Sequence, residues 1–416
     1  MSRRLLVKSG GGSFSFPAVP NITLVSIANA GALLGQNFPN AVYYNGVTYF
    51  GYDNGDNGNI EVRTYTHATG VTSAATVVEA AWEKETHDPP ALLMRASDHR
   101  LMVFYMKHSG TVARLKVATN PESIAAFGAA TNLAASIGAS DYTYPSPHQL
   151  TGLANQPIYL FFRDGNTAGT PGTEAWLTYT VSLDDGATWS TKNYVHKPTT
   201  ARPYWMVRSN SLDRIDVFIG QDERQAVDNV PGAHMYFDGT TWRGTNGTPL
   251  SGASPWAFSA FTQVNDGSTG SVDPQDIVYG HDGKPMVTWR HWTNPVANRV
   301  IHSYFARWDG STWTSYLVQT DSDEWFITDV YPTIVGWGRK LTSGTFLGGN
   351  QIYDVWRYTS SDNGLSWGKK AITSGTSDQI WYLTRVLNYG SGLRALWAEG
   401  TFTDATHFDF GILGAP

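Results

Sequence analysis

One pattern recurs seven times along the 416 residues: two short runs rich in β-branched and aromatic residues, with a turn between them. Such runs on either side of a turn are typical of β-hairpins. The turns are centred near residues 45, 98, 154, 212, 282, 338 and 390, so neighbouring turns are 53, 56, 58, 70, 56 and 52 residues apart. A unit that repeats at such a period predicts a radial array of similar sheets.

Each interval is long enough for four strands, so the pattern predicts an all-β fold, a single-domain seven-bladed β-propeller. The longest interval indicates an insertion, at Gln225–Gly232 or at Gly244–Pro255. We expect residues 1–37 to form an irregular N-terminal segment and residues 38–416 to form the propeller. Within that segment, the run Ile22–Ile27 could close the ring beside the C-terminal strand.

A second motif lies between the hairpins. The form S-x-D-x-G-x-x-W occurs at Ser182–Trp189 and at Ser360–Trp367, with shorter relatives at Asp238–Trp242 and Asp309–Trp313. The aspartate can accept backbone N–H groups and the glycine can adopt a positive φ, so we predict tight turns with the tryptophan packed beneath them. The motif resembles the Asp-box of sialidase-like propellers, which marks outer turns of the blades, away from the active site.

The composition excludes several classes of function. The formal net charge is −6, whereas a nucleic-acid-binding protein is expected to carry a basic surface. Cysteine is absent, which excludes disulfides and thiolate chemistry. No apolar stretch is long enough to predict a membrane span, and the run Leu5–Val7 is too short for the core of a secretory signal. We expect a monomer that acts outside a cell, as part of a virion or after export by another route.

Two histidines flank the second hairpin. Folding that segment about its midpoint, between Ser97 and Asp98, places His87 opposite His108 at the open end of the hairpin. Side chains opposite each other on antiparallel strands are within contact range, so the two imidazoles are predicted to lie side by side.

The next two hairpins carry polar residues at the same end. Tyr144 and Arg163 flank the third hairpin, and Arg202 and Tyr204 precede the fourth. Each of these residues alone also fits a structural role; Arg163, for example, could cap its strand in solvent. Their convergence from consecutive blades is what indicates a site, which would consist of His87, His108, Tyr144, Arg163, Arg202 and Tyr204.

Five segments of this region resemble the BNR-4 type propellers that include the ulvan lyases. They are HDPPALL at 87–93, FYMKH at 104–108, TYPSP at 143–147, YLFFR at 159–163 and RPY at 202–204. Those lyases are seven-bladed propellers. The resemblance implies that this protein cleaves a uronic-acid-containing, ulvan-like sulfated polysaccharide by β-elimination.

The resemblance also implies roles for the site residues. Arg163 would neutralise the substrate carboxylate and stabilise the enolate-like intermediate, for which a planar, always charged guanidinium is suited. His87 would remove the proton next to the carboxylate. Tyr144 would protonate the departing oxygen, or serve as the base for one epimer of the uronate, and the division of labour with His87 stays open. His108 would help to bind or neutralise the carboxylate.

Tyr204 and Arg202 would bind the sugar. The chain departs from the family pattern in two places: Asp88 follows the first histidine, and Gln221–Arg224 stands where a histidine-containing segment is expected. The elimination needs no cofactor. Asp53–Asn57, with oxygen ligands at alternate positions, could hold a structural Ca²⁺ or form a plain polar loop.

Two other functions stay open. The first is a non-catalytic carbohydrate-binding or adhesion propeller, such as a phage tail component, which the 16 Trp and 21 Tyr would suit. The second is a sialidase-like glycoside hydrolase, although the Arg-Ile-Pro motif of those enzymes is absent. A lyase releases products that absorb in the near ultraviolet, a hydrolase releases reducing ends without that absorbance, and a binding protein releases neither.

Overall fold

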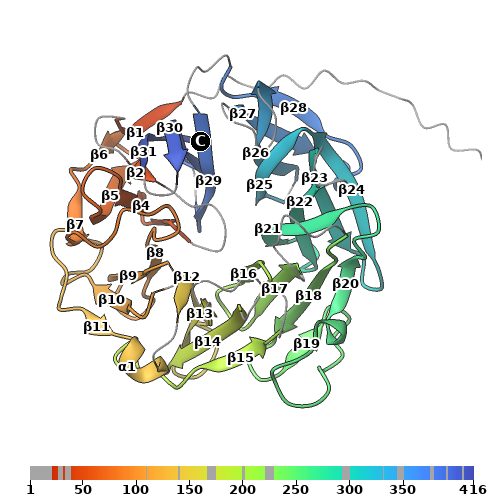
Figure 1. Cartoon of the computed structure of the whole chain (residues 1–416), viewed down its shortest axis with the longest axis horizontal. Helices are drawn as coiled ribbons and strands as arrows, with labels where there is room; N and C mark the ends of the chain where they lie inside the picture. Colours follow the sequence, from red (N-terminus) through yellow and green to blue (C-terminus); the bar gives the residue numbers. More distant parts are fainter. Residues whose placement is uncertain are drawn as a thin grey trace, which may run out of the picture.

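The computed structural model describes most of the chain, and the described residues are 21–26, 31–32, 39–108, 110–138, 141–165, 175–198, 202–220, 229–292, 300–330, 332–343, 351–374, 379–389, 392–404 and 407–416. Within them, helical structure is confined to α1 (Ala134–Ile137) and the 3₁₀ turn η2 (Phe258–Ala260). The strands form sheets that stand side by side around a central axis, and Figure 1 looks along that axis. The prediction of an all-β array of sheets is confirmed.

Five of the sheets are built from consecutive strands. In each of them neighbouring strands pair antiparallel, and the first strand of the sheet lies nearest the axis in Figure 1. Their strands are β8 (Ala91–Met94), β9 (Leu101–Met106), β10 (Ala113–Val117) and β11 (Thr131–Asn132); β12 (Tyr142–Gln149), β13 (Ile158–Asp164), β14 (Trp176–Ser182) and β15 (Asn193–His196); β16 (Trp205–Ser209), β17 (Ile215–Gly220), β18 (Gly232–Phe237), β19 (Trp242–Gly244) and β20 (Thr262–Asn265); β21 (Ser271–Tyr279), β22 (Pro285–Trp292), β23 (Ile301–Trp308) and β24 (Trp313–Thr320); and β25 (Ser322–Asp329), β26 (Ile334–Ser343), β27 (Ile352–Ser360) and β28 (Gly368–Ala371).

The sixth sheet joins the two ends of the chain. β1 pairs antiparallel with β31, where Ile22 lies opposite Gly414, and β29 pairs parallel with β3 through Val386–Ala41 and Leu387–Val42. Its strands are β1 (Ile22–Val25), β31 (His407–Ala415), β30 (Ala395–Asp404), β29 (Gln379–Leu387), β3 (Ala41–Tyr44), β4 (Val47–Asn54), β5 (Ile60–Thr66) and β6 (Val71–Thr72), with β2 (Gly31–Ala32) on β4 and β7 (Thr76–Glu79) on β5.

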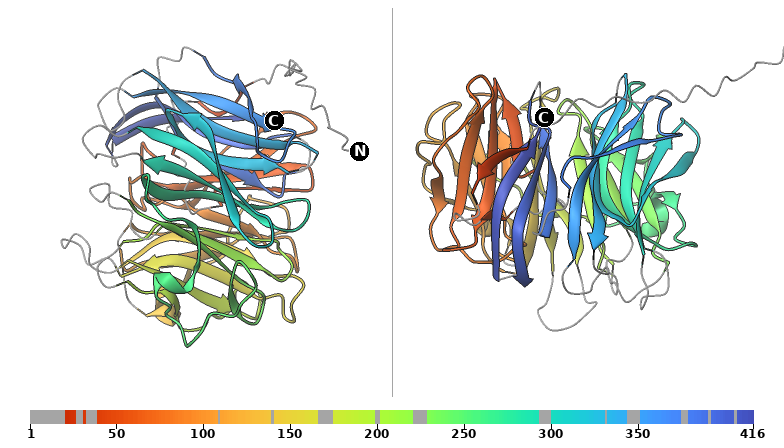
Figure 2. Two further views of the ribbon diagram at one scale, coloured as in Figure 1. Left: turned by 90° about the vertical axis from the view of Figure 1, so that its right-hand side faces the viewer. Right: turned by 90° about the horizontal axis from the view of Figure 1, so that it is seen from above.

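The apolar core lies between neighbouring sheets. Phe161 of β13 belongs to one buried cluster with Trp205 of the next sheet, and Phe218 packs edge-to-face on Trp289 of the sheet after that. Because both faces of β9 are covered, its sequence is a continuous apolar run in which every residue is buried. Seen from the side, the strands run from one face of the ring to the other, so their ends form two opposite faces (Figure 2).

The register of several hairpins agrees with the positions predicted for their turns. In the second hairpin Ala91 pairs with Phe104 and Met94 pairs with Leu101, which places the midpoint between Ser97 and Asp98. In the first hairpin Asn45 and Gly46 both have positive φ, as the predicted two-residue turn requires.

The predicted turn of the sixth hairpin, near Gly338, is wrong. β25 and β26 pair with each other, the turn lies between Asp329 and Ile334, and Gly338 lies inside β26, opposite Trp325. A Cβ atom on Gly338 would come within 2.8 Å of the Trp325 Cβ. The glycine therefore makes room for a buried tryptophan and does not form a turn.

The insertion predicted between the fourth and fifth hairpins follows β19. There η2 leads into β20, which adds to the sheet by pairing with β18. Of the alternative position, Gln225–Gly232, residues 225–228 lie outside the described residues, as does Gln221–Arg224.

The predicted S-x-D-x-G-x-x-W turns have one hydrogen-bonding pattern. Gly186 N–H donates to Ser182 Oγ at 2.8 Å, Asp184 accepts a backbone N–H, and Trp189 Nε1 donates to the Gly186 carbonyl at 3.1 Å. The corresponding atoms of Ser360–Trp367 make the same contacts. Among the described helices, none is long and apolar enough to span a membrane.

Candidate active site

The second hairpin brings its two flanking histidines together. His87 precedes β8 and His108 follows β9, and because the strands are in the predicted register, the two chains leave the hairpin side by side. The imidazole rings stack with their centroids 4.3 Å apart and their planes 17° from parallel. The sequence prediction of adjacent imidazoles therefore agrees with the structure.

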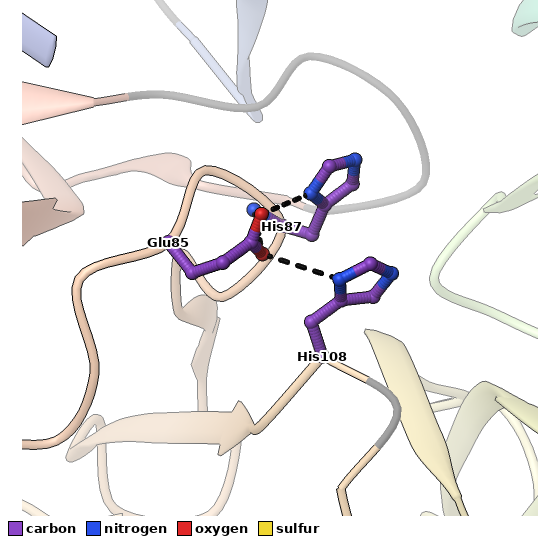
Figure 3. Close-up of side chains that lie close together, drawn as sticks. All are labelled: Glu85, His87 and His108. Atoms are coloured by element: carbon purple, nitrogen blue, oxygen red, sulfur yellow. Dashed lines mark hydrogen bonds and ion pairs between the residues drawn. The ribbon is translucent and has the colours of Figure 1, made fainter. Parts of the chain in front are cut away.

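The carboxylate of Glu85, a residue that the sequence analysis did not predict in the site, contacts both imidazole rings. Glu85 Oε1 lies 2.5 Å from His87 Nδ1, and Glu85 Oε2 lies 3.5 Å from His108 Nδ1 (Figure 3). The Glu85 side chain is about 10% exposed, and it also accepts the His87 backbone N–H. An ionised carboxylate can only accept hydrogen bonds, so this contact places a proton on His87 Nδ1. The lone pair of that imidazole is then on Nε2, which points away from Glu85 in Figure 3.

Asp88, one of the two departures from the family pattern, is an internal residue. Its side chain is buried, and its Oδ1 accepts the His108 backbone N–H at 2.5 Å, which fixes the mouth of the hairpin. Burial, reinforced by the nearby carboxylates of Glu85, Glu83 and Asp53, raises the pKa of Asp88 well above its ordinary value. The carboxyl group that departed from the family pattern is thus an internal structural group.

Tyr144 lies where the ladder of the third hairpin is interrupted. The register between β12 and β13 shifts between Thr143 and Ser146, and Tyr144 has a φ of 63°, which is rare for a residue other than glycine. A bulge of this kind re-aims a side chain. The Tyr144 ring centroid lies 6.2 Å from that of His87, and its hydroxyl oxygen lies 3.2 Å from the Tyr204 hydroxyl.

Arg163 is fully buried, so the alternative of a strand cap in solvent is wrong. Its guanidinium carbon lies 4.5 Å from the centroid of the Tyr144 ring, and its Nη2 lies 3.4 Å from His108 Nε2. Because the guanidinium is buried, a substrate carboxylate could touch it only after neighbouring side chains shift. The charge of Arg163 is thus held next to Tyr144 and His108.

His108 is an uncharged member of the pair. Burial is the main cause that lowers its pKa to about 3, and electrostatic interactions with the nearby His87, Arg163 and Arg202 contribute. Since a neutral imidazole cannot offset the charge of a carboxylate, His108 can serve only by hydrogen bonding. Arg202, half-buried just before β16, adds positive potential at the same place.

The comparison with sequence families matches this region. The model of the BNR repeat-containing family covers residues 47–321, which is more than half of the chain and includes every residue named in the site. The chain belongs to the BNR repeat-containing family. No functionally curated protein sequence matches this BNR repeat-containing protein.

Three solved structures share the fold. A PL25 ulvan lyase superposes with a TM-score of 0.72 at 15% identity, over 94% of each chain. The structure of a PL25 ulvan lyase bound to -[GlcA(1-4)Rha3S]- gives 0.71 at 16% identity, over 95% of each chain. The polysaccharide lyase Uly1 gives 0.61 at 9% identity, over 96% of this chain and 99% of that one. At these identities the likeness establishes the fold.

Glu85, His87 and His108 of this BNR repeat-containing protein are also a donor set that could hold a metal ion, since their ligand atoms lie within 4.8 Å of one another. Two ligands of one zinc ion are about 3 Å or more apart, because each bond is about 2 Å long. The 2.5 Å between Glu85 and His87 is shorter than that and is a hydrogen-bond distance. We therefore treat the cluster as a hydrogen-bonded one.

The loop considered for Ca²⁺ lies between β4 and β5. Asn54 Oδ1 accepts the Asp56 N–H at 3.0 Å, and Asn57 Oδ1 accepts the Asn59 N–H at 2.9 Å. Asp53 is buried and accepts the Glu85 N–H. Side chains that bond the backbone two residues ahead are typical of turns, and this accounts for the alternating oxygen-bearing residues.

Proposed function

We propose that this BNR repeat-containing protein is a polysaccharide lyase that cleaves a uronic-acid-containing polymer by β-elimination. The observation that supports this most is the stacked pair His87 and His108, backed by one carboxylate and facing a tyrosine whose ring lies on a buried arginine. The arrangement supplies a base, a hydroxyl and a fixed positive charge at one face of the ring. It does not contain the two opposed carboxylates that most glycoside hydrolases use.

In this mechanism His87 is the base. With its Nδ1–H on Glu85, it accepts the proton next to the sugar carboxylate at Nε2, and Glu85 stabilises the imidazolium that forms. The electron pair of the broken C–H bond becomes the double bond conjugated with the carboxylate, and the bond to the glycosidic oxygen breaks. Tyr144 gives its proton to that oxygen, and the adjacent charge of Arg163 stabilises the phenolate left behind.

The substrate class rests on the charge and on the solved relatives. Positive potential from Arg163 and Arg202 converges on the neutral His108, in a protein whose net charge is −6. A local cationic site of this kind suits a polymer with carboxylate groups. The ligand in the PL25 ulvan lyase complex, a glucuronate joined to a sulfated rhamnose, makes an ulvan-like sulfated polysaccharide our first candidate.

We also interpret the ring as seven blades with Asp-box turns. The parallel contact between β29 and β3 divides the ten-stranded sheet into two units, one from β3 to β7 and one of β29 to β31 with β1. These two units and the other five sheets make seven. The shared hydrogen bonds of Ser182–Trp189 and Ser360–Trp367 support the Asp-box interpretation.

The test offers the purified protein ulvan and other uronate polymers while the near-ultraviolet absorbance of the unsaturated product is followed. We expect activity that falls by about 10²- to 10⁴-fold in His87→Ala, the usual contribution of general acid–base catalysis. His281→Ala, which alters an exposed histidine in the turn between β21 and β22, is the matched control.

Reducing ends released without absorbance would favour a hydrolase. Binding without any cleavage would favour a carbohydrate-binding propeller. Normal rates in both His87→Ala and Tyr144→Phe would contradict the assigned roles.

A further inference from the structure

A cavity of about 570 Å³ opens at the face of the ring opposite the histidines. It is lined by residues at or beyond the far ends of the inner strands, among them Met94 at the end of β8, Thr151 after β12 and Asn388 after β29. His87 precedes the other end of β8. The inner strands that surround the cavity lie around the axis in Figure 1, so the cavity belongs to the central channel and is separate from the histidine site.

The charged residues that line this cavity are of one sign. Arg95, Arg208 and Arg385 contribute to its wall, and among the described residues no aspartate or glutamate does. This is unexpected in a chain with more acidic than basic residues. Arg95 is paired with Asp98, whose carboxylate lies at the β8–β9 turn.

The other two arginines share a single counter-ion. Arg208 Nε lies 3.0 Å from Asp276 Oδ1, and Arg385 Nη1 lies 3.0 Å from Asp276 Oδ2. Two guanidinium groups on one carboxylate leave an excess of one positive charge. Burial lowers the pKa of Arg208 to about 10, and the charge of Arg385 acts in the same direction. A buried excess charge is costly unless an anion offsets it.

The remaining wall suits a sugar ring. Tyr44, Tyr279 and Tyr389 line the cavity, together with the amide of Asn388 and the hydroxyl of Ser209. Aromatic faces with a few polar groups are typical of small-ligand sites, and the volume lies within their usual range of about 300–1,000 Å³. We propose that this cavity is a second site that binds an anionic saccharide of one or two rings, with its carboxylate or sulfate group toward Arg208 and Arg385.

The test measures binding of glucuronate, glucose 6-sulfate, glucose and inorganic sulfate to the full chain by calorimetry. We expect at least one charged sugar to bind at least tenfold more tightly than both glucose and inorganic sulfate. Arg385→Gln removes the excess charge and should weaken that binding at least tenfold. Val330→Trp fills the cavity without a change of charge and should have the same effect. His87→Ala, at the opposite face, is the matched control and should leave the binding unchanged.

Equal binding of glucose, or of inorganic sulfate alone, would overturn the proposal. So would loss of binding in His87→Ala together with normal binding in Val330→Trp, because the sugar would then occupy the histidine site. If Arg385→Gln does not fold, as judged by circular dichroism, Val330→Trp decides. The probes are not cleaved, so the result is independent of the lyase assay.

Discussion

Glu85 orients the two imidazoles, and its replacement tests that at the scale of one residue. In Glu85→Gln an amide that can donate a hydrogen bond replaces an acceptor, so His87 can adopt the tautomer with its lone pair on the wrong nitrogen. We expect turnover to fall by about 10²-fold, the low end of the range for acid–base catalysis.

Glu122→Gln is the matched control, because Glu122 is an exposed residue whose side chain accepts a hydrogen bond from Asn45, away from the two histidines. It should leave turnover unchanged. A Glu85→Gln enzyme with wild-type turnover would show that the contact seen in Figure 3 has no part in the reaction.

Asp88 makes stability depend on pH. Its pKa is raised in the folded state, mainly by burial, whereas the unfolded chain has the ordinary value of about 3.9. Between these two pKa values the folded state binds more protons than the unfolded chain. This group therefore lowers the free energy of unfolding as pH rises, by up to about 1.4 kcal/mol per pH unit within that window. Asp88→Asn keeps an oxygen for the His108 N–H and removes the titration.

We therefore expect the melting temperature of Asp88→Asn to fall less than that of the wild type between pH 4 and pH 8, on the order of a few degrees. Calorimetry at a series of pH values measures this. If Asp88→Asn is less stable than the wild type by the same amount at every pH, the carboxyl group serves only as a hydrogen-bond acceptor.

The sequence predicted the histidine pair because a hairpin is symmetric about its turn. Two residues at equal distances in sequence from the turn therefore face each other. Glu85 was overlooked because it belongs to an irregular loop, and no periodicity places a loop side chain. The burial of Arg163 was also out of reach, since it depends on the bulge that turns Tyr144 over the guanidinium.

At the scale of elements, bulges recur on the innermost strands. Tyr144 in β12, Glu324 in β25 and Tyr382 in β29 have φ values of 63°, 38° and 52°, and each lies at a shift in its ladder. Such residues are strained unless their surroundings hold them. The Glu324 side chain accepts hydrogen bonds from Arg339 and from the Leu383 backbone N–H. These bonds hold Glu324 in its strained backbone conformation.

The sequence analysis wrongly placed a turn at Gly338. A glycine between two apolar runs has the same sequence pattern whether it forms a turn or leaves room for a neighbouring side chain. Gly338→Ala places a methyl group 2.8 Å from the Trp325 Cβ and 3.2 Å from the Tyr358 ring. Overpacking of this kind costs about 1–3 kcal/mol. Urea denaturation should show this loss. Gly128→Ala, whose added methyl group would meet only ordinary contacts, should show little change, and equal stability of the two variants would contradict the packing role.

At the scale of the whole molecule, the pairing of β1 with β31 is predicted to stabilise the ring. Leu24 is buried in the cluster that contains Phe410 and Ile412 of β31. Leu24→Ala should lower the free energy of unfolding by about 2–5 kcal/mol, as for other buried leucines. Thr23→Ala, an exposed neighbour in the same strand, is the control. If Leu24→Ala unfolds like the wild type in urea, the pairing of β1 with β31 does not contribute to stability.

The same pairing fixes the order in which the molecule can be completed. Ile22 faces Gly414, 392 positions later in the sequence, so β1 can find its partner only after β31 has been synthesised. Contacts this distant in sequence form slowly. Until then the nascent chain presents unpaired strand edges at both sides of the gap, where a second chain can add. This protein is therefore most prone to aggregation when translation is slow or when many nascent chains lie close together.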